Sequence, residues 1–261
     1  MSSNITIFKN SLLLNYSKIF PKIIKNHIQS KVILNSNFLS LIDNRLKKFV
    51  SSRVCLSTEY KFYYCRIPKA ANSTVVRTLA AHITDFGLKH NDIKAQKAKK
   101  YFKNFANIKD LYPEEVLNDF FCFTFVRHPD ARVLSAYLDK LQGKTASNKK
   151  EYAEISKSTF RDFLHLLDDH LLYKNPHWAP QSELIPLNVA DMHYIGRVEN
   201  LESDLHNICN QLFNNFKGIH TRTHNITKSQ HKVDHYFSSY EKELTRKLYH
   251  NDFKLFYPDD I

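Results

Sequence analysis

Two segments of this chain share a pattern that few folds accommodate: a short apolar run, a polar loop, and then apolar residues at helical spacing. Residues 60–68 (YKFYYCRIP) are rich in aromatic side chains and end at a proline, which favours a buried strand. Residues 120–126 (FFCFTFV) repeat this composition. Helical stripes follow at residues 72–83 and 129–141, and Pro129 suits the first position of a helix. Each segment therefore predicts a strand, a loop and a helix.

Two such units indicate an α/β fold, specifically a P-loop-like three-layer fold with a largely parallel central sheet flanked by helices. The chain has only 4 glycines and 8 prolines, which disfavours a sandwich or barrel with many tight turns. In a parallel sheet, ligands bind at the carboxyl ends of the strands. The two loops are therefore the first candidates for a functional site.

The length of 261 residues suits one main domain with an extension. Between residues 5 and 50, apolar residues recur at helical spacing with lysines among them. We expect residues 1–55 to form a helical N-terminal lead-in packed on the domain, and residues 56–261 to form the domain itself. A basic amphipathic stretch can also lie on a membrane surface, so peripheral membrane contact through this segment stays an alternative.

Targeting signals and cysteine spacing favour a cytoplasmic protein. No apolar run approaches the roughly 18 residues needed to span a bilayer, and residues 1–10 lack the pattern of a signal peptide. The cysteines show no C-x-x-C spacing, and two of them lie in apolar runs, so we expect all of them to be buried and reduced. They are Cys55, Cys65, Cys122 and Cys209.

The charge points to a negative partner without identifying it. There are 38 Lys and Arg against 26 Asp and Glu, giving a formal net charge of +12. Such a surplus attracts anions, and nucleic acid, an anionic membrane, a nucleotide or an acidic polysaccharide would all fit.

The loop after the first predicted strand is suited to an anion. Backbone N–H groups at the start of the helix, the positive end of its dipole, the hydroxyls and a mobile ammonium would converge on a phosphate or sulfate. The Walker pattern of phosphate loops is absent, since the segment contains no glycine. The alternative is a plain capped helix with a surface lysine. The residues are Lys69, Ala70, Ala71, Asn72, Ser73 and Thr74.

The second loop offers Arg127 at the end of a strand and Ser135 two turns into the following helix. Arginine presents a planar fork that matches phosphate oxygens, and the serine would add one hydroxyl. Taken alone, Arg127 is equally a candidate for a surface ion pair.

Together, IPKAANST and VRHPDARVLSAYLDK resemble the two signature segments of the sulfotransferases that use 3′-phosphoadenosine 5′-phosphosulfate (PAPS), a K-x-x-x-[ST] loop and an R-x(7)-S element. They look most like the carbohydrate branch, the chondroitin and dermatan enzymes of sulfotransferase family 2. HWAPQSEL and YIGRVENLESDL are similar to that branch too, and the resemblance runs from about Tyr60 to Pro258. Because the chain shows neither the membrane anchor nor the paired cysteines of the Golgi enzymes, it looks closer to bacterial members.

The resemblance implies transfer of a sulfo group from PAPS to a hydroxyl of a carbohydrate acceptor, a polysaccharide or glycolipid that includes acidic ones. Lys69 would neutralise charge on the leaving group, while residues 70–74 would orient the 5′-phosphosulfate. Arg127 and Ser135 would hold the 3′-phosphate.

His177 in the HWAP segment is the leading candidate for the general base, because histidine titrates near neutrality, and Glu183 is the second. A buried structural role for His177 is the alternative. His128 could act as a local hydrogen-bond donor, and Trp178 could stack on a sugar ring or belong to the core.

Asn225 and Lys228, with Lys232, lie in a polar loop that the resemblance suggests folds over the cofactor. His220 with His224, and His231 with His235, have the spacing of helical zinc ligands. No third regular ligand lies near, and sulfo transfer in this family needs no metal, so none is expected.

Two functions of other classes stay open. A basic nucleic-acid-binding protein would explain the charge, yet no zinc finger or RNA-recognition signature is present, so we expect no nucleic acid partner. A catalytically inactive nucleotide-binding relative would keep the loops without turnover. A nucleotide kinase is disfavoured, because it would need a glycine-rich Walker loop and carboxylates for Mg²⁺.

Overall fold

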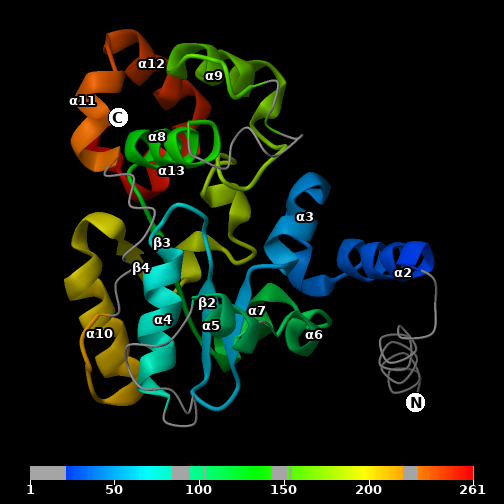
Figure 1. Cartoon of the computed structure of the whole chain (residues 1–261). Helices are drawn as coiled ribbons and strands as arrows, with labels where there is room; N and C mark the ends of the chain where they lie inside the picture. Colours follow the sequence, from blue (N-terminus) through cyan, green and yellow to red (C-terminus); the bar gives the residue numbers. More distant parts are fainter. Residues whose placement is uncertain are drawn as a thin grey trace.

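The computed structural model describes residues 22–83, 95–102, 104–142, 152, 155–219 and 229–260. Its centre is a four-stranded sheet in the order β1-β2-β3-β4 (Figure 1). The strands are β1 (Val54–Ser57), β2 (Phe62–Cys65), β3 (Phe121–Val126) and β4 (Tyr194–Arg197). β1 is antiparallel to β2, whereas β2, β3 and β4 are parallel to one another. The expected largely parallel sheet is confirmed.

Helices surround this sheet in the order of the chain. The α-helices are α2 (Lys22–Leu34), α3 (Asn44–Ser51), α4 (Asn72–His82), α5 (Ala95–Tyr101), α6 (Phe105–Ile108), α7 (Pro113–Asp119), α8 (Pro129–Lys140), α9 (Phe160–Leu166), α10 (Leu201–Phe213), α11 (Val233–Tyr236), α12 (Ser239–Leu248) and α13 (His250–Phe256). The shorter turns are η2 (Asn37–Leu39), the π-type η5 (Leu167–Leu171), η6 (Ser182–Leu184), η7 (Val189–Asp191), η8 (Val198–Asn200), η9 (Ser229–Lys232) and η10 (Pro258–Asp260).

Both predicted strand-loop-helix units are present, as β2 followed by α4 and β3 followed by α8. Pro129 is the first residue of α8, as predicted. β2 is shorter than the apolar run at 60–68, because Lys61 adopts a left-handed φ of 49° in the turn before the strand. In the parallel register Cys65 lies opposite Thr124, so the segments that follow β2 and β3 emerge at the same edge of the sheet.

Alternation along the strands creates two apolar layers, one on each face of the sheet. Phe62 and Tyr64 of β2 belong to the cluster packed against α4 and α10. Tyr63 and Cys65 belong to the other cluster, packed against α8 and the C-terminal helices. Because successive side chains of a strand point to opposite faces, this gives the expected three layers. Figure 1 shows α4 and α10 side by side along one face.

Residues 37–51 pack on the sheet domain. Phe38 is fully buried and makes an edge-to-face contact with Tyr63, with ring centroids 5.5 Å apart. Ser36 Oγ donates to the carbonyl of Lys109 over 2.6 Å. The boundary expected after residue 55 falls within β1 and stays a prediction. None of the described helices is long and apolar enough to cross a bilayer.

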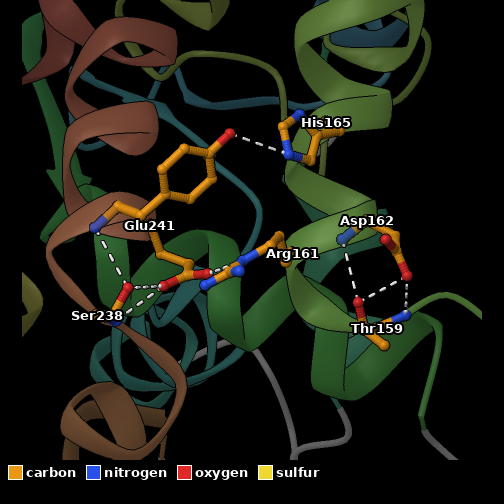
Figure 2. A network of polar contacts seen from close by, with 7 residues as sticks. Thr159, Arg161, Asp162, His165, Ser238 and Glu241 are labelled. Atoms are coloured by element: carbon orange, nitrogen blue, oxygen red, sulfur yellow. Dashed lines mark hydrogen bonds and ion pairs between the residues drawn. The ribbon is translucent and has the colours of Figure 1, made fainter.

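A polar network joins α9 to α12 (Figure 2). Each helix begins with a capping box, made by Thr159 with Asp162 and by Ser238 with Glu241. Arg161 Nε then donates to Glu241 Oε1 over 2.5 Å, connecting the two starts. The final helix expected over residues 238–249 is α12, and α13 follows it after one residue.

Candidate active site

The segment after β2 turns into α4 without a glycine. Lys69 and Ala71 take left-handed φ values of 69° and 49°. This conformation costs roughly 1–2 kcal/mol for each non-glycine residue, and such strain is typical of ligand-binding turns. The turn aims the first N–H groups of α4 out of the loop, since a helix leaves these donors without partners of its own. Ala70 is fully buried beneath the turn, and Thr74 is 9% exposed.

The Ser73 hydroxyl accepts a hydrogen bond of 3.0 Å from Lys99 Nζ of α5. Lys99 lies in the basic stretch before residue 110, to which the sequence assigned no motif. The structure therefore adds a second cation to the loop that already carries Lys69.

Lys69 points to the C-terminal turn of α8. Its ammonium lies 3.2 Å from Asp139 Oδ2, and its side chain is 14% exposed. Burial lowers the pKa of Lys69 to about 8, and the attraction of Asp139 opposes part of that fall. Near neutral pH the group is therefore a cation that needs a negative neighbour.

Arg127 follows β3 at the same edge of the sheet, and its backbone is clamped by one amide. Gln181 Oε1 accepts from the N–H of Arg127, and Gln181 Nε2 donates to its carbonyl, both over 2.9 Å. Asp252, fully buried on α13, in turn accepts from the N–H of Gln181 over 2.7 Å. Sequence reasoning missed this support, because residues 127, 181 and 252 meet only in the folded chain.

The side chain of Arg127 has an unused donor. Burial lowers the pKa of Arg127, and none of the described residues accepts a hydrogen bond from its buried Nε. A buried guanidinium donor without a partner is costly, and a phosphate oxygen would satisfy it. Ser135, 3% exposed, lies on α8 two turns further on. The chain thus offers the anion site expected here, and the surface ion pair considered for Arg127 is not found among the described residues.

Arg132 binds the two halves of the site together, although the sequence gave no reason to select it. Its fully buried guanidinium donates to the carbonyls of Pro68, Pro176 and Ala179 over 3.1, 3.1 and 2.8 Å. Pro68 precedes Lys69, while the other two carbonyls flank His177. One side chain of α8 therefore fixes both the loop and the HWAP segment.

His177 is held in one tautomer. Its Nδ1 lies 2.6 Å from Asn175 Oδ1, an oxygen that only accepts, so the ring proton lies on Nδ1. The Asn175 amide is oriented by its Nδ2, which donates to the Tyr152 hydroxyl over 2.9 Å. Nε2 is left as the proton acceptor of the ring.

The surroundings of His177 keep it neutral. Burial lowers the pKa of His177 to about 2, and the charges of Lys140, Arg53 and Lys69 lower it further. These influences place His177 in the same positive environment as Lys69. The structure therefore brings the first candidate base to the loop.

Glu183 lies on η6 and interacts electrostatically with Arg45 and Tyr173. Arg45 in turn covers the ring of Tyr173 at 4.2 Å. None of the contacts described in the structure joins Glu183 to Lys69 or His177. Of the two candidate bases, only His177 is tied to the loop.

The other named residues have local roles. Trp178 is 2% exposed and donates to the carbonyl of Leu171, so it belongs to the core. His128 Nε2 lies 3.5 Å from Asp260, and its ring packs on Phe253. Lys232 lies in η9 and is exposed.

Asn225, Lys228, His220 and His224 lie outside the described residues. Within the described part of the chain, no group of three or more His, Cys, Asp or Glu side chains is arranged to hold a metal.

A hollow of about 490 Å³ opens at the carboxyl end of β4, lined by residues 199–203 with His206 and Phe216. Glu199 on its rim accepts from the N–H of His128 over 3.0 Å and from the Tyr257 hydroxyl over 2.9 Å. Glu199 also attracts Arg127 electrostatically. The hollow therefore lies at the edge of the sheet that carries Lys69 and Arg127.

Comparison with known proteins agrees with this geometry. The chain is 32% identical over 178 residues to carbohydrate sulfotransferase 14 of Danio rerio, covering 60% of this chain and 47% of that protein. It is 27% identical over 238 residues to carbohydrate sulfotransferase 9 of Homo sapiens, covering 78% and 53%. It is 24% identical over 268 residues to carbohydrate sulfotransferase 10 of Xenopus laevis, covering 89% and 74%.

The expected similarity to the carbohydrate branch is confirmed, while vertebrate relatives do not test the expected similarity to bacterial members. The chain spans about half the length of the carbohydrate sulfotransferase 14 proteins that it matches. No solved structure matches it significantly. A family model described as "Sulfotransferase family" matches residues 52–258, which include the Lys69 loop, Arg127, Arg132 and His177. This protein therefore belongs to the sulfotransferase family.

Proposed function

We propose that this protein transfers a sulfo group from PAPS to a hydroxyl of a carbohydrate acceptor. The observation that carries the proposal is the pair of anion-binding arms at neighbouring parallel strand ends. One arm is the strained loop with Lys69 at the start of α4. The other is Arg127, whose buried Nε has no acceptor among the described residues. The spacing of the two arms suits a nucleotide with phosphates at both ends of its ribose.

The residues fit PAPS in charge and in donors. Lys69, the hydroxyls of Ser73 and Thr74 and the N-terminus of α4 would hold the 5′-phosphosulfate. Arg127 and Ser135 would hold the 3′-phosphate. When bound, PAPS supplies the sulfo group and a phosphate leaving group. The Lys69 ammonium would neutralise the charge that develops there, which is the kind of electrostatic assistance that contributes most to group transfer.

His177 would take the proton of the acceptor hydroxyl at Nε2. The Nδ1 contact with Asn175 leaves that atom available. Lys140, Arg53 and Lys69 depress the pKa of His177 in the free protein. A bound anion offsets these positive charges, so it would raise the pKa toward the range in which a general base is effective.

The same cations favour an acceptor that carries acidic groups. Lys140, Arg53 and Lys69 all act on His177, where the acceptor hydroxyl would lie. The net charge of +12 adds a long-range attraction. The names of the similar proteins support a carbohydrate rather than a small phenol or steroid as the acceptor.

Binding of 3′,5′-adenosine bisphosphate, the product nucleotide, tests the proposal. Calorimetry would compare it with 5′-AMP in the wild type, Lys69→Ala and Arg127→Ala, with Lys254→Ala as a control for the loss of one exposed charge. We expect the wild type to prefer the bisphosphate and Arg127→Ala to lose about ten- to hundredfold in its affinity, the value of charged hydrogen bonds. Arg127→Ala should bind 5′-AMP as the wild type does.

Equal affinity for the two nucleotides, or no binding at millimolar concentration, would refute the proposal. Bisphosphate binding without sulfo transfer to any carbohydrate would identify a catalytically inactive relative. Strong, salt-dependent binding of DNA with no nucleotide preference would favour the nucleic-acid alternative.

A further inference from the structure

Asp139 lies between two lysines at the C-terminal end of α8. Its Oδ2 is 3.2 Å from Lys69 Nζ and 3.0 Å from Lys140 Nζ. Asp139 is four residues after Ser135, so the two side chains share one face of the helix. A single helix face therefore carries the serine assigned to the 3′-phosphate and the carboxylate that contacts Lys69.

The charges around Lys69 make this contact consequential. Asp139 is the anion that attracts its ammonium, whereas Lys140 and Arg127 repel it. His177 belongs to the same positive group, since the charges of Lys69 and Lys140 both act on it. Without Asp139, a largely buried ammonium would face only cations and would lose its proton more easily.

Lys140 gives Asp139 a second partner. Lys69 and Lys140 together lower the pKa of Asp139, although burial opposes them. If Lys69 moves to a bound phosphate, Asp139 keeps one ion pair and is not left as an unpaired, half-buried charge. Losing its only partner would instead carry the larger penalty of an uncompensated anion.

We propose that Asp139 is a positioning residue: it holds Lys69 charged and withdrawn in the free protein, and Lys140 neutralises Asp139 when Lys69 moves to the nucleotide. The second half rests on the proposed function, because it requires a bound nucleotide. The first half concerns the free protein and can be tested without any ligand.

Amine labelling tests the first half. Lys69 of the free protein would be acetylated at pH 7 and quantified by mass spectrometry, in the wild type and in Asp139→Asn. If the pKa of Lys69 falls from about 8 by about one unit, its neutral fraction and its labelling rate rise about five-fold. Asp139→Glu keeps the carboxylate and should stay near the wild-type rate. Lys140→Gln removes a repelling charge, so it should slow the labelling.

The matched control is Asp168→Asn, which removes the carboxylate from an ion pair of 2.8 Å with the exposed Lys247. It should leave the labelling of Lys69 unchanged. Buried Lys47 and Lys109 report on folding, because they would become reactive in any variant that unfolds. An unchanged rate in folded Asp139→Asn, or a faster rate in Lys140→Gln, would overturn the role of Asp139.

Calorimetry with the bisphosphate tests the second half. Lys140→Gln should weaken binding, because Asp139 would lose its last partner when Lys69 moves. Adding Asp139→Asn to Lys140→Gln should recover most of that loss, since the amide needs no counter-ion. If Lys140 instead contacts the nucleotide directly, the double variant stays as weak as Lys140→Gln, and the exchange is wrong.

The two failures are distinguishable. A wild type that binds no bisphosphate would refute the proposed function, while the labelling of Lys69 would still judge its contact with Asp139. With turnover in hand, the alkaline limb of kcat/KM should shift down by about one pH unit in Asp139→Asn, because this limb reports the free protein. A limb at the wild-type position would contradict the proposal.

Discussion

His177 combines the geometry of a general base with an environment that suppresses its basicity. Its Nδ1 is committed to Asn175, and neighbouring cations keep the ring neutral. A base held in this way gains strength only when an anion enters. The residue thus couples proton acceptance to occupation of the nucleotide site, which protects the ring from idle protonation.

Replacing His177 by asparagine should lower kcat by about 10²- to 10⁴-fold, the usual contribution of a positioned base, without changing the affinity for adenosine bisphosphate. Steady-state kinetics and calorimetry would measure the two quantities. His170→Asn, on an exposed histidine, is the control. If Glu183→Gln lost as much activity as His177→Asn, the assignment of the base would be wrong.

At the scale of elements, α8 organises the site. Arg127 precedes its first turn, Arg132 lies inside it, and Asp139 closes it. The helix thereby sets the spacing between an anion arm, the buried clamp on three carbonyls and the partner of Lys69. A fault in α8 is expected to damage binding and stability together.

Arg132→Met should therefore cost about 2–5 kcal/mol in the free energy of unfolding, because three buried carbonyls lose their donors. Urea unfolding would measure the loss. Arg132→Lys should restore only part of it, since one ammonium cannot reach carbonyls on two segments at once. Arg246→Met, at an exposed position, should stay within about 0.5 kcal/mol of the wild type. A mild effect of Arg132→Met would show that the clamp is dispensable.

The contact between α9 and α12 should respond to acid. Hydrogen bonds from Arg161 and Ser238, the first being the larger, lower the pKa of Glu241 to about 2 (Figure 2). Because this folded value lies below the ordinary one, the stabilisation is fully present above about pH 4.5 and is lost as the pH falls towards 2.

Glu241→Gln should consequently lower the melting temperature at neutral pH but match the wild type near pH 2. The difference at pH 7 corresponds to about 2 kcal/mol, reduced from the full linkage value because Arg161 is partly solvated. Circular dichroism melts across this pH range would measure it. Glu243→Gln, on the exposed side of the same helix, is the control. A difference between Glu241→Gln and the wild type that persists at pH 2 would contradict the linkage.

For the whole molecule, the sequence predicted the parts whose signals are local. The change from strand composition to helical spacing predicted β2 with α4 and β3 with α8, and the charged loops between them marked the site. β1 was missed because four residues directly after a helix carry no distinctive period. α13 was missed because only one residue separates it from α12.

The support of the site could not be read from the sequence. Gln181, which clamps Arg127, lies 54 residues away in the chain, and Asp252 lies 71 residues beyond Gln181. Arg132 meets carbonyls 64 and 44 residues distant. Such contacts have no spacing rule, because they depend on which segments the sheet and helices bring together. Asn225 and Lys228 stay predictions.

The four cysteines report on the integrity of the whole fold. All four are free and buried, as the sequence predicted, and burial raises the pKa of each to about 12. They lie in both apolar layers and on α10. A thiolate reagent can therefore reach them only when the structure opens.

In the native protein, Ellman's reagent should react with these thiols more than about a thousand-fold slower than with an exposed thiol, since several kcal/mol of opening must precede the reaction. In guanidinium chloride without reductant all 4 cysteines should react. Asn251→Cys supplies the exposed reference, as Asn251 lies on the solvent side of α13. Fewer than four reactive thiols in denaturant would reveal a disulfide, and one fast thiol in the native protein would show that its part of the sheet opens independently of the rest.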